Sequence, residues 1–245
     1  MFSYDNIFLD SVDSTQTYCK KHFRSFSKDL ITCVIAQQQT QGKGTKGRSW
    51  VSPKGGNVYV TFTFFLNEKI NTLRSLAQLI AISTATVLTK ETVPISLKWP
   101  NDIQIHGKKV GGAMCEIETL EKGTEVFLGL GLNLHTDKAI LETIDQPATS
   151  LELETNKQWD SKALIKKIQL QFAKDLDRFL SKGFSIFSKQ YWQLLAYKKQ
   201  RITIDDGVKT FEGKLENITP EGELIVQLTS GKNATITSAT IRPKK

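Results

Sequence analysis

The sequence is poor in the residues that metal centres and disulfide frameworks require. Its 245 residues include 3 cysteines (Cys19, Cys33 and Cys115) and 3 histidines (His22, His106 and His135). An odd number of widely spaced cysteines without a CxxC pair argues against a disulfide framework, and the scattered histidines argue against a structural zinc site. The small disulfide-stapled and zinc-finger classes are therefore excluded, and no protein ligand for a metal can be named.

Long hydrophobic runs are absent as well. The most apolar stretch, residues 73–88, is shorter than the roughly 20 residues of a membrane-spanning helix, and Arg74 and Gln78 interrupt it. The amino terminus has no basic start followed by an apolar run, so no secretory signal is expected. The sequence therefore predicts a cytoplasmic protein that does not contact a membrane.

Composition and charge fit a folded protein but do not choose its partner. The chain is 39% hydrophobic and 24% charged, which is typical of a globular protein, and its length suits one large domain with a small appendage. The formal charge of +8 is spread along the chain, with short basic clusters at 198–201 and 242–245. Nucleic acid, a nucleotide, an acidic protein or merely a lysine-rich surface would each account for it.

The hydrophobic pattern predicts an α+β domain followed by a small all-β domain. We expect a short helix after Ser14-Thr15, a buried helix over 72–90, and further helices over 161–180 and 184–196. The predicted strands are 31–36, 57–66, 95–99, 102–106, 109–118 and 125–134. After Tyr197 short strands alternate with turns, which indicates a β-barrel of about 45 residues. The predicted domains are 1–196 and 197–245.

A polar loop at 37–56 contains the most informative segment, GKGTKGRSW at residues 42–50. Its glycines leave backbone N–H groups free to line a ligand, and its three cations suit a carboxylate or a phosphate. The segment fits neither the dinucleotide fingerprint nor the phosphate loop, because it leads into a tryptophan and a strand. Alone it is a weak signal, since many such loops are simply turns.

Three further segments follow in order: KWPND at 98–102, KVGG at 109–112 and GLGLN at 129–133. Together with Ser14-Thr15-Gln16 and the glycine loop, they resemble the biotin protein ligase family along the whole chain, and KWPND is highly specific. The resemblance implies a class II synthetase-like catalytic domain, with a central mixed or antiparallel sheet packed against helices, and a C-terminal SH3-like barrel. It also implies ATP-dependent, Mg²⁺-assisted ligation of biotin, through biotinyl-adenylate, to a lysine of a biotin carboxyl carrier domain.

The resemblance assigns residues to both substrates. It implies that biotin contacts Ser14, Thr15, Gln16, Gln39, Lys43, Gly44, Thr45, Lys109 and Gly112, and that ATP or adenylate contacts Arg48, Trp50, Lys98, Asn101, Gly129, Gly131 and Asn133. Lys109 would meet the biotin carboxylate and the reacting phosphate, Lys98 and Arg48 would serve the phosphates, and Asp102 would help deprotonate the incoming lysine.

Simpler interpretations of single residues stay open at this stage. Ser14 and Thr15 also suit a helix N-cap, Trp50 suits core packing, and Asp102 suits structural capping. Outside its motif, each lysine would more often be a surface charge. A lipoate or octanoyl ligase or transferase is the nearest rival enzyme, and a passive biotin- or nucleic-acid-binding module is the rival of another class.

The pattern departs from the family at two points. Thr45 stands where the family's loop usually has an arginine, so we hypothesise that biotinyl-adenylate is retained less tightly. Only 13 residues precede Ser14, whereas some family members carry a DNA-binding domain of about 60 residues or more there. We therefore expect neither a repressor function nor a nucleic-acid partner. A homodimer is left open.

Overall fold

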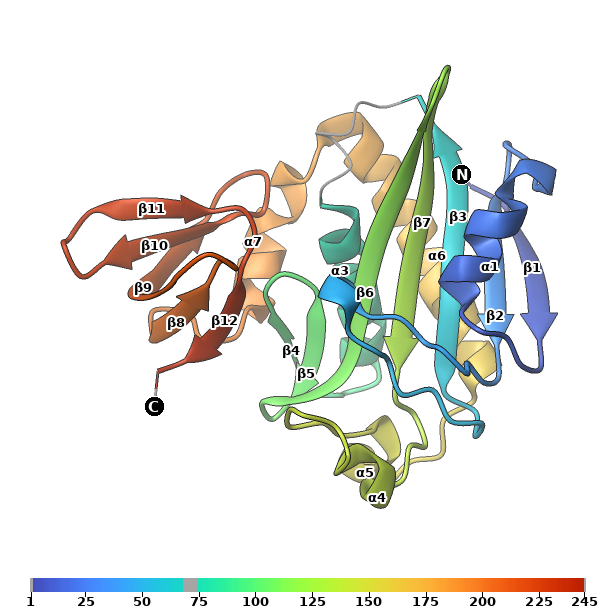
Figure 1. The fold of residues 1–245 in the computed structure, drawn as a ribbon, viewed down its shortest axis with the longest axis horizontal. Helices are drawn as coiled ribbons and strands as arrows, with labels where there is room; N and C mark the ends of the chain where they lie inside the picture. The colour runs from blue at the N-terminus through green and yellow to red at the C-terminus, as the bar shows by residue number, and fades with distance from the viewer. Residues whose placement is uncertain (1, 68–74, 245) are drawn as a thin grey trace.

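The computed structural model describes residues 2–67 and 75–244, which contain two separate sheets (Figure 1). The larger sheet has seven strands in the order β1-β2-β3-β7-β6-β5-β4, and the smaller has five in the order β11-β10-β9-β8-β12. Helices pack on the larger sheet, whereas the smaller lies to one side of it (Figure 1). The predicted α+β class with a C-terminal all-β unit is confirmed.

The larger sheet is mixed because one edge strand runs parallel to its neighbour. Its strands are β1 (Tyr4–Leu9), β2 (Ile31–Ala36), β3 (Val58–Leu66), β4 (Ile95–Lys98), β5 (Asp102–Ile105), β6 (Lys108–Leu120) and β7 (Gly123–Leu132). β1 pairs with β2 in parallel and all other pairs are antiparallel. Every predicted strand of this domain is present within two residues or so, but β1 was not predicted.

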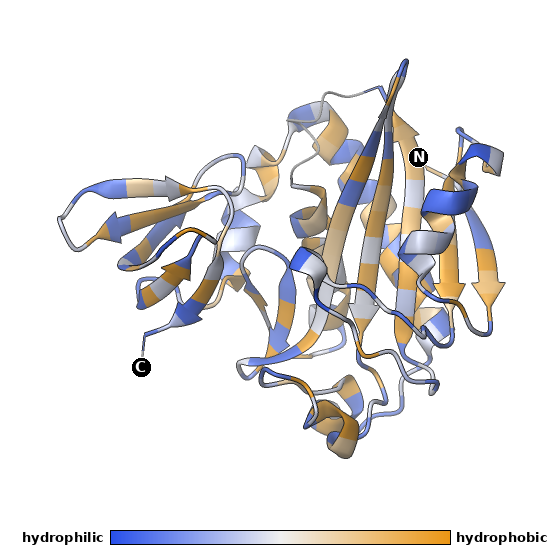
Figure 2. Ribbon diagram, viewed as in Figure 1, coloured by the Kyte–Doolittle hydropathy of each residue, from blue (hydrophilic) through white to orange (hydrophobic). Residues whose placement is uncertain are grey.

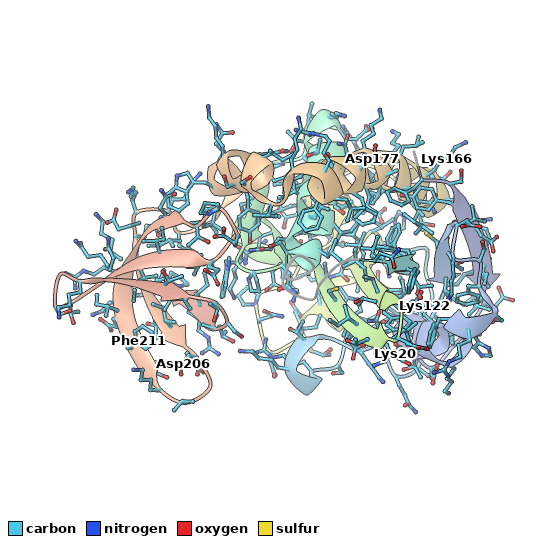
Figure 3. All side chains as sticks on the ribbon, turned by 90° about the horizontal axis from the view of Figure 1, so that it is seen from above. Lys20, Lys122, Lys166, Asp177, Asp206 and Phe211 are labelled. Carbon is cyan, nitrogen blue, oxygen red and sulfur yellow. The ribbon has the colours of Figure 1, made fainter. Side chains whose placement is uncertain are left out.

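Helices cover both faces of this sheet. One face carries α3 (Leu76–Lys90), α6 (Ser161–Lys182) and α7 (Ser185–Leu194), and the other carries α1 (Thr15–His22). α3 is apolar on nearly all sides and is therefore buried, as predicted. α6 is amphipathic, with Lys166 and Asp177 on its outer side, opposite the side on which Lys20 of α1 lies (Figure 3).

The helices of the structure differ from the predicted ones at several places. Residues 72–74 of the helix expected over 72–90 lie outside the described residues, and α3 itself begins at Leu76. Two short helices, α4 (Lys138–Leu141) and α5 (Leu151–Thr155), were not predicted because four or five residues show no helical period. Within residues 2–67 and 75–244, none of the helices has the length and apolar character that crossing a bilayer demands.

The buried side chains of the C-terminal sheet join the same hydrophobic core as the larger sheet and its helices. The strands of the C-terminal sheet are β8 (Arg201–Asp205), β9 (Thr210–Ile218), β10 (Leu224–Leu228), β11 (Asn233–Ile236) and β12 (Thr240–Pro243), all paired antiparallel. Alternate residues point inward, so that Ile202, Ile204, Leu215, Val226 and Ile241 are fully buried. Hydrophobic and hydrophilic residues alternate along these strands in Figure 2. This unit is the predicted SH3-like domain, and β8 begins four residues after the predicted boundary at 197.

Candidate active site

Two adjoining cavities lie where β4, β5, β6 and the glycine loop meet. The larger has a volume of about 300 Å³. The two cavities share six of their lining residues: Gly44, Thr45, Trp50, Asn101, Asp102 and Lys109. The glycine loop and the KWPND and KVGG segments, which are distant in sequence, therefore converge on one point between the two cavities.

The smaller cavity is lined by polar side chains from the start of α1. Ser14 occupies the N-cap position of α1, but its side chain makes no capping hydrogen bond. Its Oγ atom is buried without a hydrogen-bond partner, in a residue that is only 1% exposed. A buried hydroxyl without a partner is unfavourable in a folded protein unless a ligand or water completes it. The geometry therefore favours a ligand contact over capping for Ser14.

Thr15 and Gln39 form one hydrogen-bonded group beside Ser14. The Oε1 atom of Gln39 accepts from the backbone N–H of Thr15 at 2.9 Å, and its Nε2 atom donates to Ser52 Oγ at 2.9 Å. The hydroxyl of Thr15 lies 2.9 Å from that of Thr61. Sequence reasoning missed both Ser52 and Thr61. Thr61 carries no distinguishing signal, because it is one of two threonines in a largely apolar strand.

Gln16 lines the smaller cavity and is held by several hydrogen bonds. Its Nε2 atom donates to Phe127 O at 2.9 Å and to Glu116 at 3.0 Å, and its Oε1 atom accepts from Thr61 at 3.1 Å. A Cβ atom at Gly129 would lie 3.0 Å from Gln16 Oε1, so the glycine permits this close approach. The amide of Gln16 is therefore fixed, and it braces the neighbouring hydroxyl groups.

The glycine loop forms a tight hairpin over both cavities. Trp50 N–H donates to Gly42 O at 2.8 Å, and Gly44 N–H donates to Arg48 O at 2.7 Å. A Cβ atom at Gly42 would lie 2.4 Å from Trp50 O, so a side chain would prevent closure. Lys43 lines the smaller cavity and Arg48 the larger one, whereas Gly44 and Thr45 line both.

Trp50 forms a wall that the cavities share. Its ring packs against Gly131, where a Cβ atom would come within 2.7 Å of the indole. The Lys109 ammonium lies 5.2 Å from the ring centroid, and the indole N–H is buried without a partner. Trp50 is thus placed at the cavities rather than in the hydrophobic core. Gly129 and Gly131 line only the smaller cavity, although the resemblance grouped them with the nucleotide.

Lys109 and Asp102 form an ion pair at the junction of the cavities. The distance from Lys109 Nζ to Asp102 Oδ1 is 2.6 Å, and the two side chains are 15% and 20% exposed. Antiparallel pairing of Asp102 with Gly112 brings them together, and Gly112, which lines the smaller cavity, leaves room for the lysine side chain. Asp102 begins β5, so it caps no helix.

Lys98 ends β4 and points into the larger cavity. Burial lowers the pKa of its ammonium group below the ordinary lysine value, and the nearby cations Lys109, Arg242 and Arg48 lower it further, whereas Asp102 raises it. Four basic side chains (Lys46, Arg48, Lys98 and Lys109) line the larger cavity against one carboxylate, Asp102. This excess of positive charge suits a polyanion such as a nucleotide phosphate.

The lowered pKa of Lys98 predicts a pH dependence. Because its pKa lies below the ordinary value, the ammonium loses its proton at a lower pH than a free lysine, and affinity for an anion falls as pH rises through that range. In Lys98→Arg the guanidinium stays charged, so the alkaline loss should move to higher pH. Nucleotide affinity measured from pH 7 to 10 checks this. Identical profiles for the two proteins would contradict it.

The two asparagines brace strands at the larger cavity. Asn101 Nδ2 donates to Ala113 O while Asn101 O accepts from Ala113 N–H, and Asn133 Nδ2 donates to Thr149 O at 3.1 Å. Both residues are buried and line the cavity. Their amide N–H groups already have backbone partners, so their first effect is to hold the cavity wall.

Two further walls of the larger cavity were not anticipated. Ile144, Gln146 and Ala148 line it from the segment between α4 and α5, which is held by hydrogen bonds between Lys109 and the backbones of Pro147 and Thr149. Residues 238–241 line it from the barrel. No local sequence signal marks these residues, because only tertiary packing brings them to the cavity. In the described part of the chain, no group of three or more His, Cys, Asp or Glu residues could hold a metal ion.

Comparisons with known proteins show which sequences and folds this chain resembles. Residues 8–133 match the model of the biotin/lipoate A/B protein ligase family. The bifunctional ligase/repressor BirA of Bacillus spizizenii is 27% identical over 92% of this chain and 70% of its own length, and the chain covers 62% of its Bacillus subtilis counterpart. The biotin–[acetyl-CoA-carboxylase] ligase of Paracoccus denitrificans is 26% identical over 81% and 85%. Biotin protein ligase from Aquifex aeolicus, solved with biotin and ATP, has a TM-score of 0.82 at 29% identity over 98% of this chain and 99% of its own.

Proposed function

This chain belongs to the biotin/lipoate A/B protein ligase family, and on that premise we propose that it ligates biotin, at the expense of ATP, to a lysine of a carrier protein. The observation that carries the proposal is the pair of cavities joined at Lys109 and Asp102. One cavity presents hydroxyl and amide groups, and the other presents an excess of cations. The Aquifex aeolicus ligase of the same fold was solved with biotin and ATP.

The smaller cavity suits the ureido head of biotin, which both donates and accepts hydrogen bonds. Ser14 Oγ has no partner within the protein and is free to bond to it, while Thr15 and Gln39 stand beside it in fixed orientations. A ligand without a ureido group would leave the Ser14 hydroxyl unpaired, at a cost of about 1–3 kcal/mol for a buried polar group. This favours biotin over lipoate.

At the junction, the biotin carboxylate attacks the α-phosphate of ATP and forms biotinyl-adenylate, with release of pyrophosphate. Lys109 draws the two anions together, and Lys98 and Arg48 hold the phosphates in the larger cavity. The loop from Lys43 to Thr45 covers the anhydride and keeps water from it. The acceptor lysine then attacks the anhydride carbonyl and releases AMP, and Asp102 is the nearby carboxylate able to take its proton.

Magnesium would enter with ATP rather than sit in a protein cage. Among the residues that the structure describes, Asp102 is the one carboxylate that lines the larger cavity, and it is paired with Lys109. Mg²⁺ is commonly held by substrate phosphates and waters with one or two carboxylates. It would add positive charge on the phosphate oxygens, which the cations of the larger cavity also neutralise.

We further propose that residues 1–196 form the catalytic domain and 197–245 the barrel, and that the acceptor is a biotin carboxyl carrier domain. The name of the relative from Paracoccus denitrificans gives acetyl-CoA carboxylase as the protein to which it ligates biotin.

Pyrophosphate release on mixing the protein with ATP and biotin tests the proposal, with lipoate in a parallel reaction. Release that depends on biotin supports it. Release with lipoate alone would identify a lipoate ligase, and binding without release would identify a passive binder.

Thr45 predicts a weakness in adenylate retention. Thr45 lines both cavities, yet its side chain carries no charge. We expect Thr45→Arg to add a cation beside the adenylate phosphate and to slow release of biotinyl-adenylate by about 5- to 10-fold, a typical gain for one charge-assisted contact. Stopped-flow measurement of release checks this, with Thr40→Arg, in the loop but outside both cavities, as the control. Equal release rates for wild type and Thr45→Arg would count against it.

A further inference from the structure

The barrel contacts the KWPND motif through one turn, residues 219–223, which joins β9 to β10. Three side chains of the catalytic domain donate hydrogen bonds to two consecutive carbonyls of this turn. Ser75 Oγ donates to Glu221 O at 2.7 Å, Gln78 Nε2 donates to Gly222 O at 2.7 Å, and Trp99 Nε1 donates to Gly222 O at 2.9 Å. Trp99 is the tryptophan of the motif, directly after Lys98.

A further hydrogen bond holds Pro100 of the motif from α7. The Tyr191 hydroxyl lies near the side chain of Gln78. That hydroxyl donates to Pro100 O at 2.6 Å. Gln78, Trp99 and Tyr191 are between 0% and 6% exposed, so these hydrogen bonds lie out of water, where a lost partner is costly. Trp99 is thus bonded directly to Gly222, and the adjacent Pro100 is held by Tyr191, a neighbour of Gln78.

The turn also fits its site sterically in a way that only glycine allows. Gly222 has φ +86°. A Cβ atom there would lie 2.5 Å from Gln78 Oε1 and 2.8 Å from the ring of Phe184. A side chain would therefore push the turn away from α3 and α7 and break the bonds that its carbonyl accepts.

We propose that Gly222 and its turn are a positioning element for nucleotide binding. The turn holds Trp99 and Pro100, and with them the flanking residues Lys98 and Asp102, against the larger cavity. It also seats the barrel so that residues 238–241 form one wall of that cavity. The head-group residues Ser14 and Thr15 lie at the N-terminus of α1 and take part in none of the hydrogen bonds just described. The inference rests on the proposed function, because it assigns the larger cavity to ATP.

Gly222→Ala tests this, with Gly231→Ala as the matched control. Gly231 has a similar φ of +82° in another barrel turn, but a Cβ atom there has nothing within 4 Å. Both variants place alanine at a similar positive φ, but only Gly222→Ala disturbs the packing of the 219–223 turn against the catalytic domain. The assay is biotin-dependent ATP–pyrophosphate exchange. We expect the KM for ATP to be at least about 10-fold higher for Gly222→Ala than for Gly231→Ala, because the loss of a buried hydrogen bond has an effect of this size. The Kd for biotin should rise by a smaller factor than the KM for ATP, because Asn101 and Asp102 line both cavities, whereas Lys98 and residues 238–241 line only the larger one of the two.

Tyr191→Phe is the second variant, and it decides the matter if Gly222→Ala does not fold. It removes the donor to Pro100 O and keeps the buried ring, so the KM for ATP should rise about 5-fold or more. A KM for ATP that matches the control, or a parallel loss of biotin affinity, would overturn the inference. Absence of exchange in the wild type would instead refute the proposed function.

Discussion

Lys109→Ala is expected to reduce biotinyl-adenylate formation on the order of 1,000-fold. The ammonium of Lys109 is the charge at the junction of the two cavities, where the carboxylate and the phosphate must approach each other. Removing one preorganised charge-stabilising group from an enclosed site typically costs about 100- to 1,000-fold. The substitution also leaves the partly buried Asp102 carboxylate without its partner at 2.6 Å, which adds a repulsive charge to the site.

Lys108→Ala is the matched control for that experiment. Lys108 is adjacent on β6, but its side chain is 51% exposed, pairs with Glu154 at 3.1 Å and lines neither cavity. Its removal should change the rate by no more than about twofold, since exposed ion pairs contribute little. Single-turnover adenylate formation measured for both variants checks the prediction. Equal rates for Lys109→Ala and Lys108→Ala would contradict the claim that the charge of Lys109 at the junction promotes adenylate formation.

Ser14→Ala is expected to weaken biotin binding by roughly 10- to 100-fold without lowering stability, because a lost hydrogen bond to a buried ligand costs about 1–3 kcal/mol. Ser14 Oγ has no hydrogen-bond partner among the residues that the structure describes, so its removal breaks no hydrogen bond between them. A capping role predicts the opposite pattern, with a loss of about 1 kcal/mol of stability and unchanged affinity. Isothermal calorimetry and thermal unfolding together distinguish the two.

Ser150→Ala supplies a close comparison for Ser14→Ala. Ser150 also stands at a helix N-cap, makes no capping hydrogen bond, is 1% exposed and has an unpaired Oγ. It lines neither of the two cavities. Its truncation should leave both stability and biotin affinity unchanged. Biotin affinity that falls equally in the two variants would remove Ser14 from the proposed binding site.

The order of short segments in the sequence explains why much of the site could be anticipated. Lys98, Asp102 and Lys109 lie within twelve residues, and such short spacing forces adjacent antiparallel strands whose ends coincide. The sequence also pointed to Ser14 and Thr15 as candidate site residues, but it did not distinguish a ligand contact from helix capping. A capping serine and a ligand-binding serine have the same local sequence, and only the direction of the Ser14 side chain distinguishes them.

What the sequence did not reveal depends on contacts between distant segments. Arg242 lies 144 positions after Lys98, yet it is close enough to lower the pKa of that lysine. Thr61 was hidden inside an apolar strand, and the Gly222 turn looked like any other turn. β1 was not predicted because its polar and apolar residues do not alternate regularly. It is an edge strand, so one side of it has no neighbouring strand. These features have no local period or motif.

The most direct test of the proposed function compares wild type with the Lys98→Ala/Lys109→Ala double variant. The measurement is the intact mass of a biotin carboxyl carrier domain after incubation with the enzyme, biotin and Mg-ATP. Wild type should add one biotin to the carrier, and the double variant, which lacks the ammonium groups of Lys98 and Lys109, should add none on the same timescale. A double variant that labels the carrier as fast as wild type would contradict the claim that these two charges bring biotin and ATP together.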